Sequence, residues 1–196
     1  MIASDRARVL RVMTALAIAA GLVGVVVWQA NQIQTGASES ESTATGPGLT
    51  VFLGSEGIEL PAITGRTLSG RRLSLEEFGG HVVVLSIWSS SCEACRAEAL
   101  DLAALKRETK PLGVRFVGID VRDRPSDGRT FQRRAGLVDP SLDDSDGRVL
   151  DEIRGTVAVD SVPSTLLVDA DGLIRARWVG KADAITLRDL IAEMDE

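Results

Sequence analysis

Two cysteines separated by two residues constrain the possible folds of this chain more than any other feature of its sequence. Cys92 and Cys95 are the only cysteines among its 196 residues. They follow an apolar run, Val82 to Trp88, that is typical of a buried strand, and they open a helical pattern that continues to about Lys106. A strand, a Cys-x-x-Cys motif and a helix in this order indicate a redox-active dithiol in an α/β domain.

The position of the pair at a helix start favours a reactive thiol. Unpaired backbone N–H groups and the positive end of the helix dipole stabilise a thiolate there. We expect Cys92 to be the attacking thiol and Cys95, one turn later and pointing inward, to be the resolving thiol. A disulfide between them closes a very small loop and stabilises the fold little, so exchange chemistry explains the pair better than a structural role.

Two other interpretations of the cysteine pair stay open. The first is half of a zinc site, for which the single histidine, His81, is the candidate third ligand. The second is a pair of inert core cysteines. The position of the motif at a helix start, behind three serines, favours the redox interpretation over both.

The residues just before the helix predict a capping box. Ser90 would be the N-cap, and the Glu93 side chain would reach back to its backbone N–H. This arrangement places Cys92 in the first turn, exposed to solvent. The alternative for Glu93 is an ordinary first-turn acid, which the helix dipole favours.

Glu98 is the third residue that we expect to act in this site. The apolar positions of the helix are Cys95, Ala99, Leu102 and Leu105, and Glu98 falls on the same face. A carboxylate there should be partly buried, which raises its pKa. Beside Cys95 it could exchange a proton with the resolving sulfur. A solvated acid at the edge of the apolar face is the alternative.

The N-terminal region predicts a membrane anchor. The run from Val12 to Trp28 has Thr14 as its one clearly polar residue, and three arginines precede it. Its length exceeds the roughly 7–15 apolar residues of a signal peptide and approaches that of a spanning helix. The positive-inside rule then puts the N-terminus in the cytoplasm and the rest outside. Cleavage near Ala37, which would release a secreted domain, is the alternative.

The chain therefore divides into three predicted parts. Residues 1–30 are a cytoplasmic tip and a transmembrane signal anchor. Residues 31–48, rich in Ser, Thr, Gly and Glu, are a flexible tether. Residues 49–196 are one domain of ordinary size. The formal net charge of −6 offers no basic surface for nucleic acid.

Strand and helix patterns alternate within the domain. A βαβ unit followed by a β-hairpin and a helix predicts an α/β fold with a central mixed sheet flanked by helices. The acidic run 143–147 is similar to a calcium loop, but Leu142 and Ile153 occupy its first and twelfth positions, so we expect a turn. The expected strands are 81–88, 114–121, 164–168 and 173–179, the expected helices 92–106, 126–135, 149–154 and 182–194, and a small hairpin is expected at 67–75.

Several strings of residues connect this domain to a known group. They are Leu75-x-x-Phe78-x-Gly80-x-Val82-Val83-Val84-Leu85, Trp88-x-x-x-Cys92-x-x-Cys95-Arg96-x-Glu98, Phe116-Val117-Gly118-Ile119-Asp120, Asp139-Pro140-Ser141-Leu142 and Val162-Pro163-Ser164-Thr165. In these strings the domain resembles the TlpA/ResA/CcmG group of membrane-tethered thioredoxin-like proteins. The resemblance implies a thioredoxin-like fold, a cis proline at Pro163 that faces the cysteines, and Glu98 as the group's buried acid. It also implies that Trp88, Val162 and Pro163 bind substrate.

The chain departs from the pattern of this group at two positions. Ser91 stands where an aromatic residue usually precedes the first cysteine, and Leu100 stands where a proline usually follows the acid by two. In addition, Ser86 stands where cytoplasmic thioredoxins have a buried aspartate. These differences affect the expected substrate more than the expected chemistry.

These features predict a membrane-anchored, extracytoplasmic thiol–disulfide oxidoreductase without a cofactor or metal. The resemblance favours a reductase of protein disulfides, supplied by a membrane electron donor and acting in apocytochrome c maturation. An oxidase or isomerase of the same fold is the first alternative, because potentials within the fold differ widely. A copper-delivery module is the second, and it would need a third soft ligand such as His81.

Overall fold

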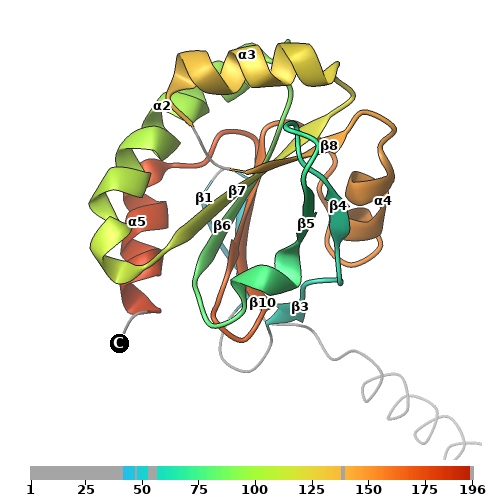
Figure 1. Cartoon of the computed structure of the whole chain (residues 1–196). Coiled ribbons are helices and arrows are strands. Elements are labelled where there is room, and N and C mark those ends of the chain that lie inside the picture. Colours follow the sequence, from blue (N-terminus) through green and yellow to red (C-terminus); the bar gives the residue numbers. More distant parts are fainter. Residues whose placement is uncertain (1–41, 47, 53–56, 138–139, 195–196) are drawn as a thin grey trace, which may run out of the picture. The chain divides into compact units, whose positions relative to one another are not determined.

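A mixed β-sheet forms the centre of the computed structural model, which describes residues 42–46, 48–52, 57–137 and 140–194 (Figure 1). Strand β6 pairs in parallel with β7 and antiparallel with β9, which confirms the predicted mixed sheet. A further short strand, β3 (Ile58–Glu59), pairs with β10. Across the sheet the order is β1 (Ser42–Gly46), β2 (Leu49–Phe52), β10 (Leu173–Val179), β9 (Ser164–Val168), β6 (Val83–Trp88), β7 (Arg115–Val121) and β8 (Ser141–Asp144).

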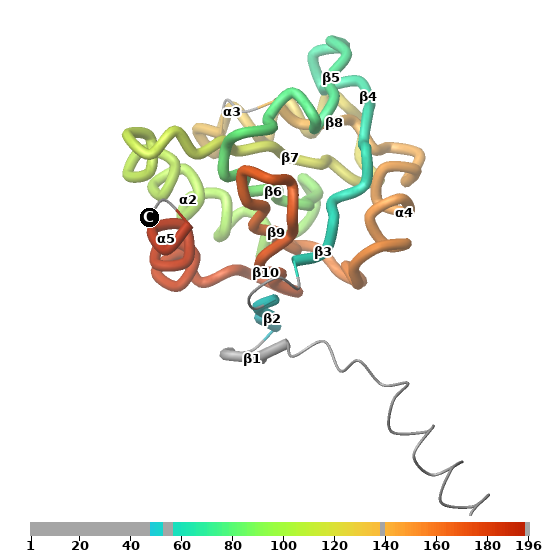
Figure 2. Tube along the Cα trace, turned by 90° about the horizontal axis from the view of Figure 1, so that it is seen from below, coloured from blue at the N-terminus to red at the C-terminus, as the bar shows by residue number. Residues whose placement is uncertain are grey.

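Helices cover both faces of this sheet. Helices α2 (Glu93–Glu108) and α5 (Ala184–Glu193) lie on one side, and α4 (Arg148–Arg154) lies on the opposite side in both views (Figures 1 and 2). Helix α3 (Pro125–Ala135) lies across the end of the sheet where α2 begins (Figure 1). The remaining elements are the hairpin of β4 (Thr64–Arg66) and β5 (Arg72–Ser74) and the 3-10 helices η1 (Leu75–Phe78) and η2 (Lys110–Leu112).

Strand β6 is buried on both faces, which explains its nearly continuous apolar sequence. Leu85 and Ile87 pack in the same hydrophobic cluster as Ile153 of α4. Val84, which precedes Leu85 and points to the opposite face, packs with Leu187 of α5 in the cluster on the other side. Because successive side chains of a strand point to opposite faces, each layer needs its own apolar set.

Most of the predicted elements are confirmed. The two strands joined through Asp171-Gly172 have the predicted bounds, and Gly172 adopts a positive φ of 85° in the turn between them. Gly136 ends α3 in the left-handed conformation, with φ of 71°, as a helix-terminating glycine does. The hairpin expected at 67–75 is present as β4 and β5, but it begins earlier than expected, at Thr64.

The acidic run after residue 140 differs from the prediction. Its first part belongs to β8 (Ser141–Asp144), which pairs with β7, and only the following residues turn. Asp144 is fully buried. Its burial is tolerated because the carboxylate accepts the backbone N–H groups of Val149, at 2.8 Å, and Leu150, at 3.0 Å. The carboxylate thus accepts backbone N–H groups of the first turn of α4, which have no partner within the helix.

The sheet begins earlier in the chain than predicted. Strand β1 (Ser42–Gly46) falls within the range 31–48 that the composition assigns to a flexible tether, and it pairs antiparallel with β2. Backbone hydrogen bonds, which side-chain composition does not reveal, order this segment. The predicted anchor, Val12 to Trp28, lies outside the described residues. Within the described ranges, no helix has the length and apolar character that a membrane crossing requires.

Candidate active site

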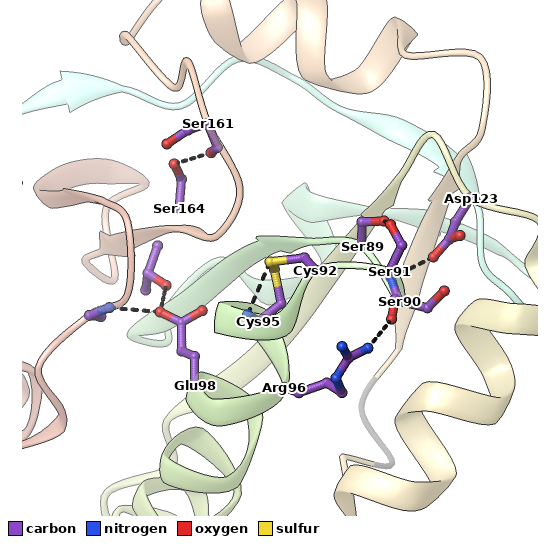
Figure 3. The surroundings of a disulfide bond; sticks show 12 residues. Ser89, Ser90, Ser91, Cys92, Cys95, Arg96, Glu98, Asp123, Ser161 and Ser164 are labelled. Atoms are coloured by element: carbon purple, nitrogen blue, oxygen red, sulfur yellow. Dashed lines mark hydrogen bonds between the residues drawn. A yellow bond between two sulfur atoms is a disulfide. The ribbon is translucent and has the colours of Figure 1, made fainter.

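Cys92 and Cys95 form a disulfide at the beginning of α2 (Figure 3). Their Cα atoms are 5.2 Å apart. Cys92 is partly exposed, whereas the Cys95 side chain is only 2% exposed. The fold therefore leaves one sulfur within reach of another protein and keeps the second beneath it, as an attacking and a resolving thiol require.

The first turn of α2 is capped by Cys92 itself. Its backbone is extended, and its Sγ accepts the backbone N–H of Cys95 at 3.0 Å. The predicted capping box of Ser90 and Glu93 is therefore wrong. Because the helix begins at Glu93, this acid occupies the first helical position instead of the third, from which a side chain can reach back to the cap. A sulfur at the N-cap faces the unpaired N–H groups of the helix, which stabilise its thiolate after reduction.

The turn that precedes the disulfide is held by three hydrogen bonds (Figure 3). The hydroxyl oxygens of Ser89 and Ser91 are 3.1 Å apart. The backbone N–H of Ser90 donates to Asp123 Oδ2 at 2.6 Å, and the Ser90 carbonyl accepts from Arg96 Nη1 at 2.9 Å. These contacts fix the path of the chain from the end of β6 to Cys92.

An apolar cluster lies around Cys95. The rings of Trp88 and Phe131 are stacked within it, with centroids 4.6 Å apart and planes at 22°. Trp88 is only 4% exposed, so little of its side chain is open to a substrate, and its contact with substrate stays a prediction. Its ring is turned to Phe131 in the core and supports the site from below.

The Val162–Pro163 peptide bond is cis, as the family resemblance implies. Pro163 is buried, and its carbonyl accepts the N–H of Gly180 at 2.8 Å. Val162 is partly exposed and packs against the cluster around Cys95, as does Cys92. Of the three predicted substrate contacts, Val162 is therefore the one whose side chain lies at the surface beside the disulfide.

Glu98 lies one turn after Cys95 and is only 1% exposed (Figure 3). Its Oε1 accepts the N–H of Ala182 at 2.8 Å and the hydroxyl of Thr165 at 3.1 Å. Burial raises the pKa of Glu98 above its ordinary value, and these hydrogen bonds oppose the shift only in part. The expected burial is confirmed, and the alternative of a solvated acid is wrong.

Asp120 is a buried acid to which the sequence analysis assigned no role. It is only 1% exposed, and within the described ranges its Oδ1 has no hydrogen-bond partner. Burial, followed by the nearby Asp123, raises its pKa to about 8. The signal in the sequence is a single acid inside the apolar strand β7, directly opposite Trp88 in the parallel register.

The ligand suggested for zinc or copper lies away from the cysteines. His81 stands just before β6, whereas the cysteines follow its other end, and His81 Nε2 lies 3.4 Å from Arg115 Nη2. In the parts of the chain that the structure describes, no three His, Cys, Asp or Glu residues are grouped closely enough to hold a metal ion. The metal-binding interpretations therefore lack their third ligand there.

A family comparison agrees with this geometry. Residues 57–177 match the model of the AhpC/TSA family. The chain belongs to the AhpC/TSA family. Its similarity to thiol-disulfide oxidoreductase ResA of Bacillus subtilis, 28% identity over 120 residues, covers 61% of this chain and 65% of ResA. Its similarity to thiol:disulfide interchange protein DsbE of Allochromatium vinosum, 35% identity over 106 residues, covers 54% and 55%. The chain thus spans less than two thirds of either relative.

Solved structures confirm the predicted fold. A secreted thiol-disulfide isomerase from Corynebacterium glutamicum superimposes with a TM-score of 0.70 at 24% identity, covering 78% of this chain and 95% of that one. A DsbF homologue from Corynebacterium diphtheriae gives 0.69 at 25% identity, covering 77% and 96%. The thioredoxin-like fold and the resemblance to the ResA group are therefore confirmed. The two curated relatives are named for thiol–disulfide exchange.

Replacing Glu98 by Gln should stabilise the fold increasingly as the pH rises. The amide oxygen can still accept from Thr165 and Ala182, but it carries no buried charge. When the pKa of a carboxyl group is raised in the folded state, the protein loses stability as the pH rises from the unfolded-state pKa to the folded-state pKa. The loss is at most about 1.4 kcal/mol per pH unit. Urea unfolding of the wild type and of Glu98→Gln across this pH range should show a difference in the free energy of unfolding that widens as the pH rises. A constant gap, or the same widening in Glu93→Gln at an exposed position, would contradict the assignment.

Proposed function

We propose that this chain is a thiol–disulfide oxidoreductase that reduces disulfide bonds in other proteins. The observation that carries the proposal is the partly exposed Cys92 at the N-cap of α2, disulfide-bonded to the buried Cys95. The names of the relatives support the same class of reaction. Protein thiols and disulfides are therefore the proposed substrates.

In the first step, the Cys92 thiolate attacks one sulfur of a substrate disulfide. The substrate S–S bond breaks, a mixed disulfide forms, and the second substrate sulfur leaves as a thiolate that takes a proton from solvent. Cys95 then transfers its proton to Glu98 and attacks the Cys92 sulfur. The mixed disulfide breaks, the first substrate sulfur also leaves, and the Cys92–Cys95 disulfide forms. Two electrons have passed from the pair to the substrate.

Glu98 suits this proton transfer because its environment weakens its acidity. A carboxylate exchanges protons with a thiol more readily when its pKa is raised toward that of the thiol. Burial supplies that shift here, and the hydrogen bonds from Thr165 and Ala182 hold the side chain in place. The proposed role of Glu98 is thus to accept the proton of Cys95 in the second step.

We also propose a location and a source of electrons. The segment from Val12 to Trp28 would anchor the chain, with residues 49–196 outside the cytoplasm. A membrane protein would then return the pair to its dithiol form after each cycle. The resemblance to the TlpA/ResA/CcmG group supports this arrangement and favours apocytochrome c as a substrate. The same exchange run in reverse would make the chain an oxidase, which is the alternative.

A trapping experiment tests the reaction. In the Cys95→Ser variant of the full chain, the mixed disulfide cannot be resolved, so Cys92 should remain linked to its substrate proteins. These adducts should appear on non-reducing gels and disappear with reductant. The Cys92→Ser variant is the matched control and should form few or none. Equal trapping by the two variants, or none by either, would contradict the proposed roles.

The pH dependence of exchange tests Glu98. In Glu98→Gln the second step should slow by roughly a hundredfold, a usual contribution of a positioned base, because Cys95 loses its proton acceptor. The mixed disulfide should therefore persist longer, and the step in the pH profile that Glu98 causes should disappear. The first step, measured as alkylation of Cys92, should be unaffected. An unchanged pH profile would remove Glu98 from the mechanism.

A further inference from the structure

Asp120 is a buried carboxyl group that the exchange reaction does not use. It lies near the end of β7, beside Trp88 of β6. Its Oδ1 has no hydrogen-bond partner within the described ranges. Its Oδ2 lies against Gly128 of α3, where any side chain would collide with it. An uncompensated buried carboxylate is costly, so this group is expected to be protonated or to share a proton.

The groups around Asp120 favour the protonated form. The strongest charge effects come from Asp123 in the loop after β7, Asp143 of β8 and Asp127 of α3, all of which are acidic. Together with burial, which is the largest cause, they raise the pKa of Asp120 to about 8. At neutral pH Asp120 therefore has a hydroxyl group to donate, and a side-chain hydrogen bond with Asp123 is among the causes of its raised pKa.

Asp123 connects this buried acid to the cysteines. Its Oδ2 accepts the backbone N–H of Ser90 at 2.6 Å, a short N–H···O bond of the kind that a carboxylate acceptor favours (Figure 3). Ser90 precedes Cys92 by two residues, and Arg96 of α2 holds its carbonyl. A displacement of Asp123 would therefore act directly on the turn that carries Cys92.

We propose that Asp120 and Asp123 are positioning residues: they share one proton as a carboxylic acid–carboxylate pair and thereby hold the turn before Cys92 in place. The hydroxyl of Asp120 donates to Asp123, and Asp123 accepts the Ser90 N–H. Loss of the shared proton leaves two carboxylates side by side. Their repulsion weakens the bond to Ser90 and loosens the turn in alkaline solution. Only the consequence for disulfide exchange rests on the proposed function.

The Ser90 backbone amide reports on this pair directly. We would follow its NMR signal in the ¹⁵N-labelled full chain, in the disulfide form, from about pH 6 to about pH 9.5, so that neither cysteine titrates. The wild-type signal should move with a midpoint of about 8. In Asp120→Asn it should stay at its neutral-pH position, because the amide still donates to Asp123 without titrating. Asp127→Asn, the control on α3, should still titrate, with its midpoint moved to lower pH, because one of the charges that raise the pKa of Asp120 is removed.

Two further measurements complete the test. Asp123→Ala removes the acceptor, so the Ser90 signal should be displaced at every pH. In the reduced proteins, oxidised glutathione should react about twofold to tenfold faster with Asp120→Asn than with the wild type above pH 8, and equally fast at pH 6; this is the range that one hydrogen bond supplies.

The outcomes separate this inference from the proposed function. A wild-type Ser90 signal that does not titrate, or one that still titrates in Asp120→Asn, would overturn the pair. Equal glutathione rates at high pH would overturn its positioning role. If neither protein reacts with glutathione at all, the proposed function fails, while the Ser90 titration still decides whether Asp120 and Asp123 share a proton.

Discussion

The chemistry of this domain depends on one junction, where the buried strand β6 ends and α2 begins. The strand is packed on both faces, so its end is fixed in space, and the Ser89–Ser91 turn leads from it to the helix. The unpaired N–H groups of α2 then point at Cys92, whose sulfur serves as the cap. The surrounding contacts, from the Trp88–Phe131 stack below to Val162 beside the disulfide, support this junction.

Glu98 and Asp120 are both buried acids, and they differ in their hydrogen bonding. Glu98 receives hydrogen bonds from Thr165 and Ala182, so it is held in place while burial weakens its acidity. Asp120 leaves one oxygen without a partner among the described residues, and its neighbours are acidic. The first arrangement suits a group that exchanges a proton during reaction, and the second suits one that keeps its proton at neutral pH.

The sequence predicted those parts of the structure that rest on local pattern. Strand β6, the cysteine pair and the burial of Glu98 all follow from apolar periodicity and spacing. The N-cap at Cys92 could not be predicted, because it depends on where the turn from β6 delivers the chain, and the nearby Ser90 is a better intrinsic cap. Strand β8 was missed because one of its acids, Asp144, is buried and satisfied by amides of α4, which are distant from any strand pattern. The bond between Ser90 and Asp123, 33 residues apart, leaves no periodic signal.

The reduction potential of the Cys92–Cys95 couple in the full chain tests the central claim most directly. The helix N-terminus favours the thiolate of Cys92, but the acids nearby, Glu93, Glu98 and Asp123, disfavour negative charge on the sulfurs and hence the reduced form. A reductase requires a value near that of thioredoxin, about −270 mV, and this is the predicted result. A value near about −120 mV would contradict it, because the pair would then accept electrons from substrate thiols and act as an oxidase.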